Sequence, residues 1–294
     1  MYFSPNMRGA ALMSASMAGF ALNDTALKYG GADLGLFQAI FIRGLFATAI
    51  MAIFAYFLGT FKHVPRARDL RLIGLRSVAE IGATLAFLTA LFNLPLANLT
   101  AILQALPLSI ALAAAIFFNE PLGHRRITAI LIGFIGVLII VRPGFAEFSA
   151  YSLLGLVAVA FVTLRDLTAR QLSPSVASVL VAFVASIAIT LTGAIGVVLT
   201  QTWRPPTLFE FGTLALAAVF LMIGYCCAVA TMRIGDVAIV SSFRYTVMLW
   251  AITLGWLVFG DIPDLWTFLG ICIILLAGLF TIWRERKLAK KTKH

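Results

Sequence analysis

Ten long apolar segments, joined by short polar connections, make up nearly the whole of this 294-residue chain. Most hold about 20 residues, the length that an α-helix needs to cross a hydrocarbon layer about 30 Å thick. Hydrophobic residues reach 62% of the sequence and charged residues only 12%, about half their usual share in soluble domains. A soluble domain of this length cannot enclose so much apolar surface, so the sequence predicts an all-α polytopic membrane protein. The expected transmembrane helices cover residues 8–28, 36–58, 70–92, 95–118, 126–141, 151–171, 175–199, 208–231, 236–259 and 264–284.

The basic residues are divided unevenly between alternate connections, and this predicts the orientation of the chain. With the N-terminus in the cytoplasm, the outer side holds only Lys28, Arg142 and Arg204. The inner side holds the six basic residues of the tail "RERKLAKKTKH" together with Arg8, Lys62, Arg66, Arg68, Arg71, Arg125, Arg126, Arg170 and Arg233. The positive-inside rule therefore predicts cytoplasmic termini and many crossings of the inner (cytoplasmic) membrane. The net charge of +10 is scattered over connections, so we expect the lipid bilayer, and no nucleic acid, as a partner.

The two halves of the sequence resemble each other when the second is shifted back by about 141–142 residues. "EIGATLAFLTAL" then falls on "MIGYCCAVATMR", and "LNDTALK" falls on "LRDLTAR". The matched residues are Gly82 with Gly224, Ala86 with Ala228, Thr89 with Thr231, Ala97 with Ala238, Glu120 with Asp261, and Asp24 with Asp166. Five segments are an odd number, so the two halves must cross the membrane in opposite senses. We expect residues 1–144 and 145–294 to form two inverted five-helix repeats, an architecture found in transporters.

Two longer stretches carry a family resemblance. The stretch "ANLTAILQALPLSIALAAAIFFNEPL", followed by "GFIGVLIIVRPG", resembles the EamA family of the drug/metabolite transporter superfamily. Its echo in the second half is "GDVAIVSSFRYTVMLWAITLGWLVFGD", which has Asp261 where that half of the family often carries Glu. The resemblance covers the whole chain and implies ten helices with a central cavity. It implies that the first, third, fourth, sixth, eighth and ninth segments line this cavity, and it implies transport without indicating a substrate.

Seven ionisable residues fall inside the apolar segments, where a charge at the helix centre costs about 2.5–3.5 kcal/mol. They are Asp24, Arg43, Arg76, Glu80, Arg165, Asp166 and Arg244. Arg43 and Arg76 have a structural alternative, because a long arginine side chain can reach the headgroups or join two helices. Glu80 has no such alternative, since it is short and central. We therefore expect Glu80 to face a wet cavity, where it could carry a proton.

The spacing of these charges predicts how they pair. Arg76 lies one turn before Glu80 on the same face, which favours an ion pair between them. Arg165 and Asp166 are adjacent and point about 100° apart, so we expect them to find separate partners. Arg244 is the expected partner of Asp166.

A cavity lined by polar groups should form where the charges of the two halves meet. Gln104 lies three residues before Pro107, a proline that removes a backbone donor and frees a carbonyl; the resulting kink could also serve packing alone. Asp24 and Asp166 are expected to be counterparts that serve the outer and inner halves of one pathway. The predicted substrate-binding residues are Asp24, Arg76, Glu80, Gln104, Arg165, Asp166, Tyr225, Arg244 and Tyr245.

These features favour a secondary transporter of a small organic metabolite. A cavity with both signs of charge suits an amino acid, an amino-acid derivative or a mixed-charge compound such as a nucleoside-type sulfonium metabolite, with proton coupling through a carboxylate. The alternative is a flippase for lipid or lipid-linked headgroups. An enzyme is not expected, because the three histidines lie in connections or at the end and no nucleophile motif occurs. No residue pattern suggests a metal or another cofactor, and the oligomeric state stays open.

Overall fold

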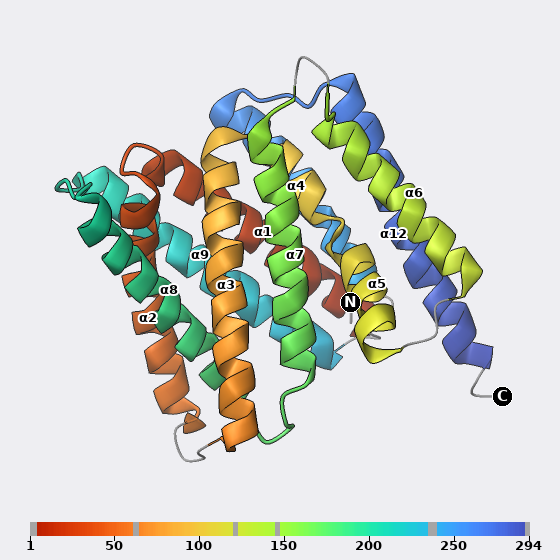
Figure 1. Cartoon of the computed structure of the whole chain (residues 1–294), viewed down its shortest axis with the longest axis horizontal. Helices are drawn as coiled ribbons and strands as arrows, with labels where there is room; N and C mark the ends of the chain where they lie inside the picture. Colours follow the sequence, from red (N-terminus) through yellow and green to blue (C-terminus); the bar gives the residue numbers. More distant parts are fainter. Residues whose placement is uncertain (1–4, 61–64, 120–122, 145–147, 235–239, 292–294) are drawn as a thin grey trace.

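The computed structural model describes residues 5–60, 65–119, 123–144, 148–234 and 240–291, and in these residues it is helical without a strand (Figure 1). The helices are α1 (Pro5–Gly31), α2 (Leu36–Phe57), α3 (Ala67–Asn93), α4 (Leu96–Leu103), α5 (Leu106–Phe118), α6 (His124–Val141), α7 (Ala150–Arg170), α8 (Ser178–Thr200), α9 (Leu208–Ile234), the 3-10 helix η2 (Ser241–Thr246), α11 (Val247–Leu254), the π-helical turn η3 (Gly255–Phe259) and α12 (Leu265–Lys291). The start of the ninth predicted segment, 236–239, and Glu120 lie outside the described residues.

Eight helices of the described chain are long and apolar enough to cross a membrane, counting α4 with α5 and η2 with α11 and η3. Residues Ile127–Val141 of α6 form a shorter apolar helix. Helix α1 has 27 residues but is more polar, because it carries Asn23, Asp24 and Lys28. The chain is therefore an all-helical, multi-pass membrane protein, as the sequence predicted.

Helices from the two halves pack against each other in an exchangeable pattern. Helix α1 packs on α9, and α3 packs on α7; α2 packs on α8, and α6 packs on α12. Exchanging the halves converts the α1·α9 pair into the α7·α3 pair and leaves the other two pairs unchanged. Thr48 and Thr190, which lie 142 residues apart (190 − 48 = 142), hydrogen-bond to each other at 3.0 Å. Residues that meet their own counterparts lie on a two-fold axis, and the duplicated, inverted repeat fits this arrangement.

Glycines permit the closest helix contacts, and several of them respect the same exchange. A Cβ atom on Gly82 would lie 2.7 Å from the ring of Phe161, and one on Gly224 would lie 2.9 Å from the ring of Phe20. A Cβ atom on Gly136 would meet Gly270 at 3.0 Å, where α6 crosses α12. These glycines therefore serve close packing, in which small residues let membrane helices approach.

The ends of the helices define two edges of the molecule that differ in charge. One edge holds the starts of α1, α3 and α6 and the end of α7, and we call it the basic edge. There, Asp69 accepts hydrogen bonds from the backbone and hydroxyl of Ser173, at 3.1 and 3.0 Å. Its exposed arginines are Arg8, Arg66, Arg68, Arg71, Arg125 and Arg170.

The opposite edge holds few cations, and those in the described residues have partners. Lys28 donates to a carbonyl between α3 and α4. Arg142, at the end of α6, pairs with Asp264 before α12. Arg204, between α8 and α9, pairs with Glu210. Charge at this edge is therefore locally neutralised, whereas the basic edge presents a surplus of positive charge.

A break interrupts the helical segment after residue 103, as Pro107 predicted. Helix α4 ends at Leu103 and α5 begins at Leu106, with Pro107 in its first turn. The corresponding segment of the second half is also irregular, since η2 gives way to α11 after Thr246. Helix α4 is deeply buried, because Leu96, Leu99 and Ile102 are almost completely inaccessible to solvent.

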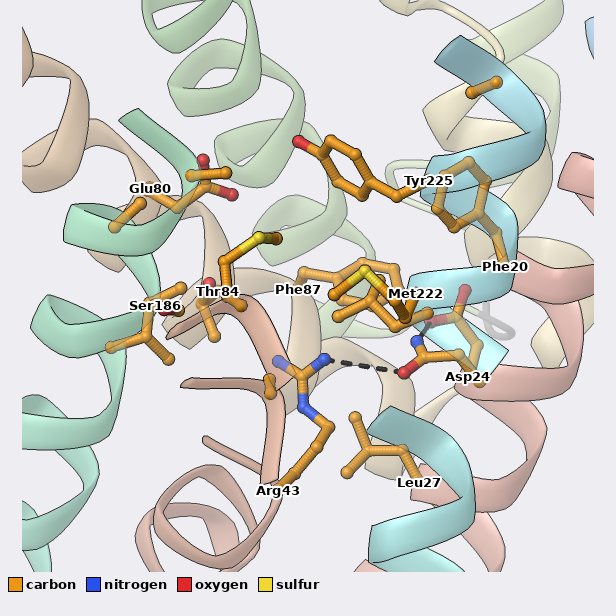
Figure 2. A pocket seen from close by; sticks show the side chains of 18 of the residues that line it. Phe20, Asp24, Leu27, Arg43, Glu80, Thr84, Phe87, Ser186, Met222 and Tyr225 are labelled. Atoms are coloured by element: carbon orange, nitrogen blue, oxygen red, sulfur yellow. Dashed lines mark hydrogen bonds between the residues drawn. The ribbon is translucent and has the colours of Figure 1, made fainter. Parts of the chain in front are cut away.

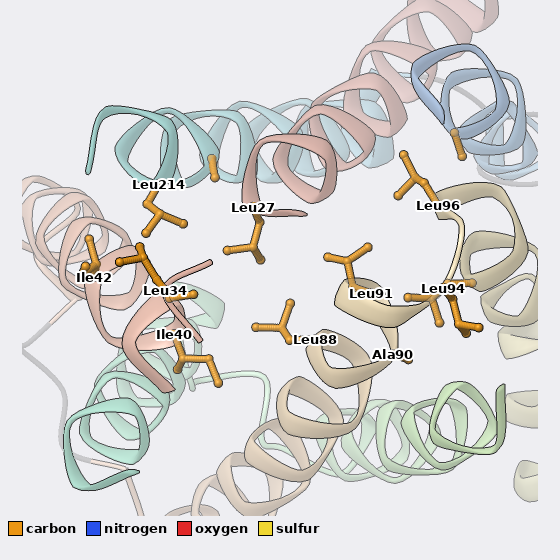
Figure 3. Packing of buried hydrophobic residues seen from close by; sticks show 14 residues of the cluster. Leu27, Leu34, Ile40, Ile42, Leu88, Ala90, Leu91, Leu94, Leu96 and Leu214 are labelled. Atoms are coloured by element: carbon orange, nitrogen blue, oxygen red, sulfur yellow. The ribbon is translucent and has the colours of Figure 1, made fainter. Parts of the chain in front are cut away.

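An apolar cluster closes the centre of the molecule toward the opposite edge. Figure 3 shows Leu27 of α1 and Leu88 and Leu91 of α3 pointing toward one another. Leu34 and Leu214 belong to the same cluster, and all five side chains are buried. Packing of this kind excludes water, so this end of the molecule is sealed.

Candidate functional site

A cavity of about 570 Å³ lies between the two halves, a volume typical of small-molecule sites. Helices α1, α2, α3, α8 and α9 supply most of its wall, with Arg165 from α7 and Arg244 from η2. The expected contribution of the fourth segment is wrong, because the side chains of α4 are taken up by the core. Helices α2 and α8 line the cavity instead, because they cross at the two-fold axis beside it.

The cavity is closed at one end and open at the other. Leu27 and Leu88, at its floor, are 0% and 1% exposed and belong to the apolar cluster. Farther toward the basic edge, the exposed fraction rises to 18% for the Glu80 side chain, 24% for Arg165 and 40% for Tyr225. The cavity therefore opens toward the basic edge.

Glu80 is the centre of a charge network on the α3·α7 pair. Its Oε2 atom pairs with Arg76 at 3.3 Å, which confirms the predicted pair one helical turn apart. Its Oε1 atom accepts a hydrogen bond from Arg165 of α7 at 3.0 Å. Both carboxylate oxygens are thus engaged, and the second contact joins two helices.

The prediction that Arg165 and Asp166 find separate partners is wrong. The Nε atom of Arg165 donates to Oδ1 of Asp166 at 2.8 Å. Adjacent Cβ atoms do diverge, but the long arginine side chain lets its guanidinium fold back to its neighbour while its NH1 atom reaches Glu80. The expected Arg244–Asp166 pair is also wrong, since no ion pair joins these two described residues and Asp166 is held by Arg165.

A second polar cluster lies deeper, on α1 and α2 (Figure 2). Asn23 donates from Nδ2 to Oδ1 of Asp24 at 2.8 Å and accepts from NH1 of Arg43 at 3.5 Å. Figure 2 shows Arg43 and Asp24 near Leu27, with Glu80 and Tyr225 on opposite walls farther from the floor. The cavity therefore contains two separate charged clusters along its length.

Apolar and aromatic side chains fill the wall between these clusters. The rings of Phe20 and Tyr225 meet edge to face, with centroids 6.3 Å apart. Phe87 and Met222 lie between the two charged levels in Figure 2. Such a wall offers an apolar body of variable shape a place to pack, because methionine side chains are flexible and polarizable.

The structure brings six of the nine predicted residues into the cavity wall: Asp24, Arg76, Glu80, Arg165, Tyr225 and Arg244. The other three lie elsewhere. Gln104 is at the break between α4 and α5. Asp166 is directed to Arg165 outside the cavity wall, and the buried Tyr245 places its hydroxyl against Gly278 of α12.

The expected correspondence of Asp24 with Asp166 also shifts by one residue. Phe20 and Phe161 make equivalent contacts with Gly224 and Gly82, and their offset is 141 (161 − 20 = 141). That offset places Arg165 opposite Asp24 (24 + 141 = 165). Arg165, and not Asp166, is the residue of α7 that lines the cavity, so a one-residue slip accounts for the wrong expectation.

Arg43 was given a structural alternative and was not among the predicted substrate-binding residues, yet it lies in the cavity wall and is 9% exposed. Thr84 and Ser186 also line the cavity and were not predicted. The available signal for Arg43 was its position inside an apolar segment, which fixes depth but not direction. Hydroxyls such as Thr84 give no signal, because threonine and serine are tolerated throughout membrane helices.

Two exchangeable helical halves around a charged cavity, sealed at one edge and open at the other, define a polytopic membrane protein of the transporter class. The chain belongs to the EamA-like transporter family, whose model matches residues 7–142 and again 149–283. The two matches fall on the two halves that the structure relates by exchange.

Curated relatives over the whole length are transporters. The chain is similar to an S-adenosylmethionine uptake transporter of Rickettsia bellii, with 23% identity over 94% of each chain. It is similar to the pseudopaline exporter CntI of Pseudomonas aeruginosa, with 25% identity over 88% of this chain and 90% of that one. A riboflavin transporter of Vibrio cholerae is 26% identical over 96% of this chain and 95% of its own.

A solved structure has the same fold. It superposes with a TM-score of 0.61 at 16% identity and covers 93% of this chain and 96% of its own. At this identity the likeness supports the fold alone.

Proposed function

We propose that the protein is a secondary transporter that moves a small, mixed-charge organic solute across the cytoplasmic membrane by alternating access. The observation that carries the proposal is the cavity, which holds both signs of charge, is sealed at the opposite edge and opens at the basic edge. Two inverted repeats, residues 1–144 and 145–294, would exchange conformations and so open the cavity to each side in turn.

The named relatives support a metabolite as the solute. Their names specify three different compounds, S-adenosylmethionine, pseudopaline and riboflavin, so they support the class of solute and not one compound. The four arginines and two carboxylates in the cavity wall favour a solute with both charges, because a buried charge is stabilised chiefly by an opposite one.

The distribution of charge supports an orientation with the basic edge in the cytoplasm. Exposed arginines gather at that edge, whereas Lys28, Arg142 and Arg204 at the opposite edge have partners. In this orientation both termini are cytoplasmic, as the positive-inside rule requires. Reporter fusions after His294 should read cytoplasmic and one after Pro206 periplasmic; a periplasmic C-terminus would contradict the orientation.

Transport is tested by counterflow with purified protein in liposomes. Water-soluble metabolites with both charges are first screened for thermal stabilisation of the protein, and each stabilising compound is loaded inside the liposomes. Labelled compound outside should then accumulate transiently, with and without an imposed pH gradient to detect proton coupling. Arg43→Gln should reduce the rate of counterflow at least about tenfold, because the solute would lose a contact with a charged group. Arg68→Gln at the basic edge serves as the matched control.

The same liposomes distinguish the alternative. Movement of a labelled phospholipid between leaflets, with no counterflow of any stabilising metabolite, would identify a lipid flippase and overturn the proposal. Counterflow without lipid movement supports it.

A further inference from the structure

We infer that the solute is elongated and bipolar, with a cationic group at Asp24, an anionic group at Arg244 and an apolar body between them. This inference rests on the proposed function and specifies the solute of the same cavity. Three charged side chains of the cavity wall have no ion-pair partner in the described residues: Asp24, Arg244 and Arg43, which donates to Asn23 beside Asp24. The inference follows from the distance between Asp24 and Arg244, which lie at different levels of the cavity.

The Glu80 network is committed within the protein. Both oxygens of Glu80 receive arginines, and Arg165 is shared between Glu80 and Asp166. A solute group that displaced any of these contacts would leave a charge without its partner, which costs more than the new contact returns. The network is therefore a poor place for a solute to bind.

Asp24 is the acid in the cavity wall that still has a carboxylate oxygen available for a solute. It is half-buried, and the hydrogen bond it receives, from Asn23, goes to Oδ1. No cation of the described residues lies within ion-pair distance of it, because the guanidinium of Arg43 donates to Asn23 instead. Oδ2 of Asp24 is therefore free to accept a solute's ammonium or a similar cation.

Arg244 is the corresponding cation. It lines the cavity, its side chain is exposed, and its guanidinium makes no hydrogen bond or ion pair with the part of the chain that the structure describes. Counting Asp166 with its partner Arg165, the charges at the cavity sum to +1 (four arginines, three acids). An anionic group on the solute neutralises this surplus, and arginine binds carboxylates in a two-pronged geometry.

The distance between these two groups sets the length of the solute. Val240 and Val247, on either side of Arg244 in the chain, pack against Met13 and Met17 of α1. Asp24 follows those methionines by 7 and 11 residues (24 − 17 and 24 − 13), or about 10–16 Å along the helix. The Arg244 side chain spans part of that length, so charged ends about 5–10 Å apart bridge the gap.

The wall between the two groups suits an apolar body. Met17 and Phe20 lie between the level of Arg244 and that of Asp24 on α1, and Phe20 meets the ring of Tyr225. A simple α-amino acid, with its charges on adjacent carbons, reaches only one of the two groups. A longer solute reaches both and covers this wall.

A chemical ruler tests the inference on the wild-type protein. The probes are glycine, γ-aminobutyrate, ε-aminocaproate, aminooctanoate and aminoundecanoate, each compared with the alkylamine of the same chain length. Affinity is measured by calorimetry and by thermal shift. Subtracting the alkylamine isolates the carboxylate contribution, which should peak at ε-aminocaproate or aminooctanoate and exceed that of glycine at least about tenfold. A contribution that does not depend on length would overturn the inference.

Two variants assign the ends. Arg244→Gln should weaken ε-aminocaproate at least about tenfold and leave hexylamine unchanged. Asp24→Asn should weaken ε-aminocaproate and hexylamine and leave hexanoate unchanged. Arg68→Gln and Asp33→Asn, outside the cavity, are the matched controls. An equal loss of affinity for ε-aminocaproate and hexylamine in Arg244→Gln contradicts the assignment. If a variant does not fold, the length series measured on the wild-type protein decides whether the inference holds.

The inference and the proposed function fail in different ways. Counterflow of a metabolite, with a carboxylate contribution that does not depend on chain length, would support the transporter and contradict the elongated, bipolar solute. A carboxylate contribution that peaks with chain length, without counterflow of ε-aminocaproate, would support the binding site and contradict transport.

Discussion

The pairs α3·α7 and α1·α9 occupy equivalent places in the two-fold arrangement, yet different interactions hold them. Glu80 and Arg165 join α3 to α7 with an ion pair at 3.0 Å. Helix α1 meets α9 at small residues, where the hydroxyl of Ser16 donates to the carbonyl of Gly224 at 2.7 Å. A Cβ atom on Gly19 would lie 2.9 Å from the backbone nitrogen of Gly224, so these helices touch backbone to backbone.

The comparison shows that one geometry can be stabilised in a membrane by charge or by close packing. An ion pair fixes a particular contact but leaves strongly charged groups beside the cavity. Close packing uses no charge, so it leaves the facing acid of α1, Asp24, available. The pair with packed glycines thus carries an acid that has no ion-pair partner in the described residues, while the other pair carries charges that already pair with one another.

The largest effect should come from breaking the charged pair. Glu80→Gln leaves Arg76 without a full negative partner and Arg165 with Asp166 alone, and the loss of one member of a buried pair costs about 3–5 kcal/mol. We expect a corresponding fall in the free energy of unfolding, measured in mild detergent. Adding Arg165→Gln should recover part of the loss, as coupled residues do in a double-mutant cycle. Unchanged stability in Glu80→Gln would show that the network does not hold α3 to α7.

The packed pair should be less sensitive. Gly19→Ala places its methyl against the backbone of α9, at 2.9 Å from Gly224 and 3.0 Å from Phe220, and overpacking costs about 1–3 kcal/mol. Gly212→Ala, on the facing helix α9, is the control, because nothing lies within 4 Å of its added Cβ. Thermal unfolding should separate the two variants, and equal melting temperatures would mean that α1 and α9 are not in backbone contact.

A hydroxyl pair at the two-fold axis gives a smaller effect. Thr48→Val removes the interhelical hydrogen bond to Thr190 and keeps the side-chain shape. Such bonds average about 0.6 kcal/mol in membrane proteins, and the Thr190 hydroxyl keeps a second bond to the carbonyl of Ser186. Chemical denaturation should show a loss below about 1 kcal/mol, and a loss as large as that of Gly19→Ala would indicate a larger role for the axis.

The smallest effect is expected at the opposite edge, where an ion pair is exposed. Partial burial alone would raise the pKa of Asp264, but hydrogen bonds from Arg142 and Thr267 outweigh it and lower the pKa to about 2. Because the folded-state pKa is depressed, this stabilisation is present above the ordinary value of 3.8 and is lost as the pH falls toward 2. With 46% of the Asp264 side chain exposed, the contribution is well below 1 kcal/mol.

Asp264→Asn should therefore melt slightly below the wild type at neutral pH. This difference in melting temperature should vanish as the pH falls toward the folded-state pKa of about 2. A difference that persists or grows in acid would point to a contact other than the ion pair with Arg142.

Hydropathy predicted the helices well because the bilayer imposes a length on every crossing. The Arg76–Glu80 pair was predictable since both residues share one helix and its geometry is fixed. The break near Pro107 was predictable from the missing backbone donor. In each case the physical cause lies within a few residues of the effect.

Features that depend on helix rotation were not predictable. Depth could be read for Arg43, Asp166 and Tyr245, but whether each faces the cavity depends on how its helix is turned against its neighbours. A rotation of about 100° separates Arg165, in the wall, from Asp166, outside it. The fold-back of Arg165 onto Asp166 depends on side-chain length, which a comparison of helix faces ignores.

The leucine floor of the cavity has a consequence for the resting population. Exchange of the halves carries Leu27 of α1 onto Thr168 of α7 by the offset of 141 (168 − 27 = 141), and Leu88 of α3 onto Ala230 of α9 by the offset of 142 (230 − 88 = 142). A state sealed at the basic edge would thus bury a threonine and an alanine where the present state buries two leucines, a deficit of about 2 kcal/mol at each position. Together these disfavour that state by roughly a thousandfold, so the empty protein should rest open at the basic edge. Spin-label distances across that edge should show one dominant population, and Leu88→Ala should raise the minor one; two equal populations in the wild type would contradict this bias.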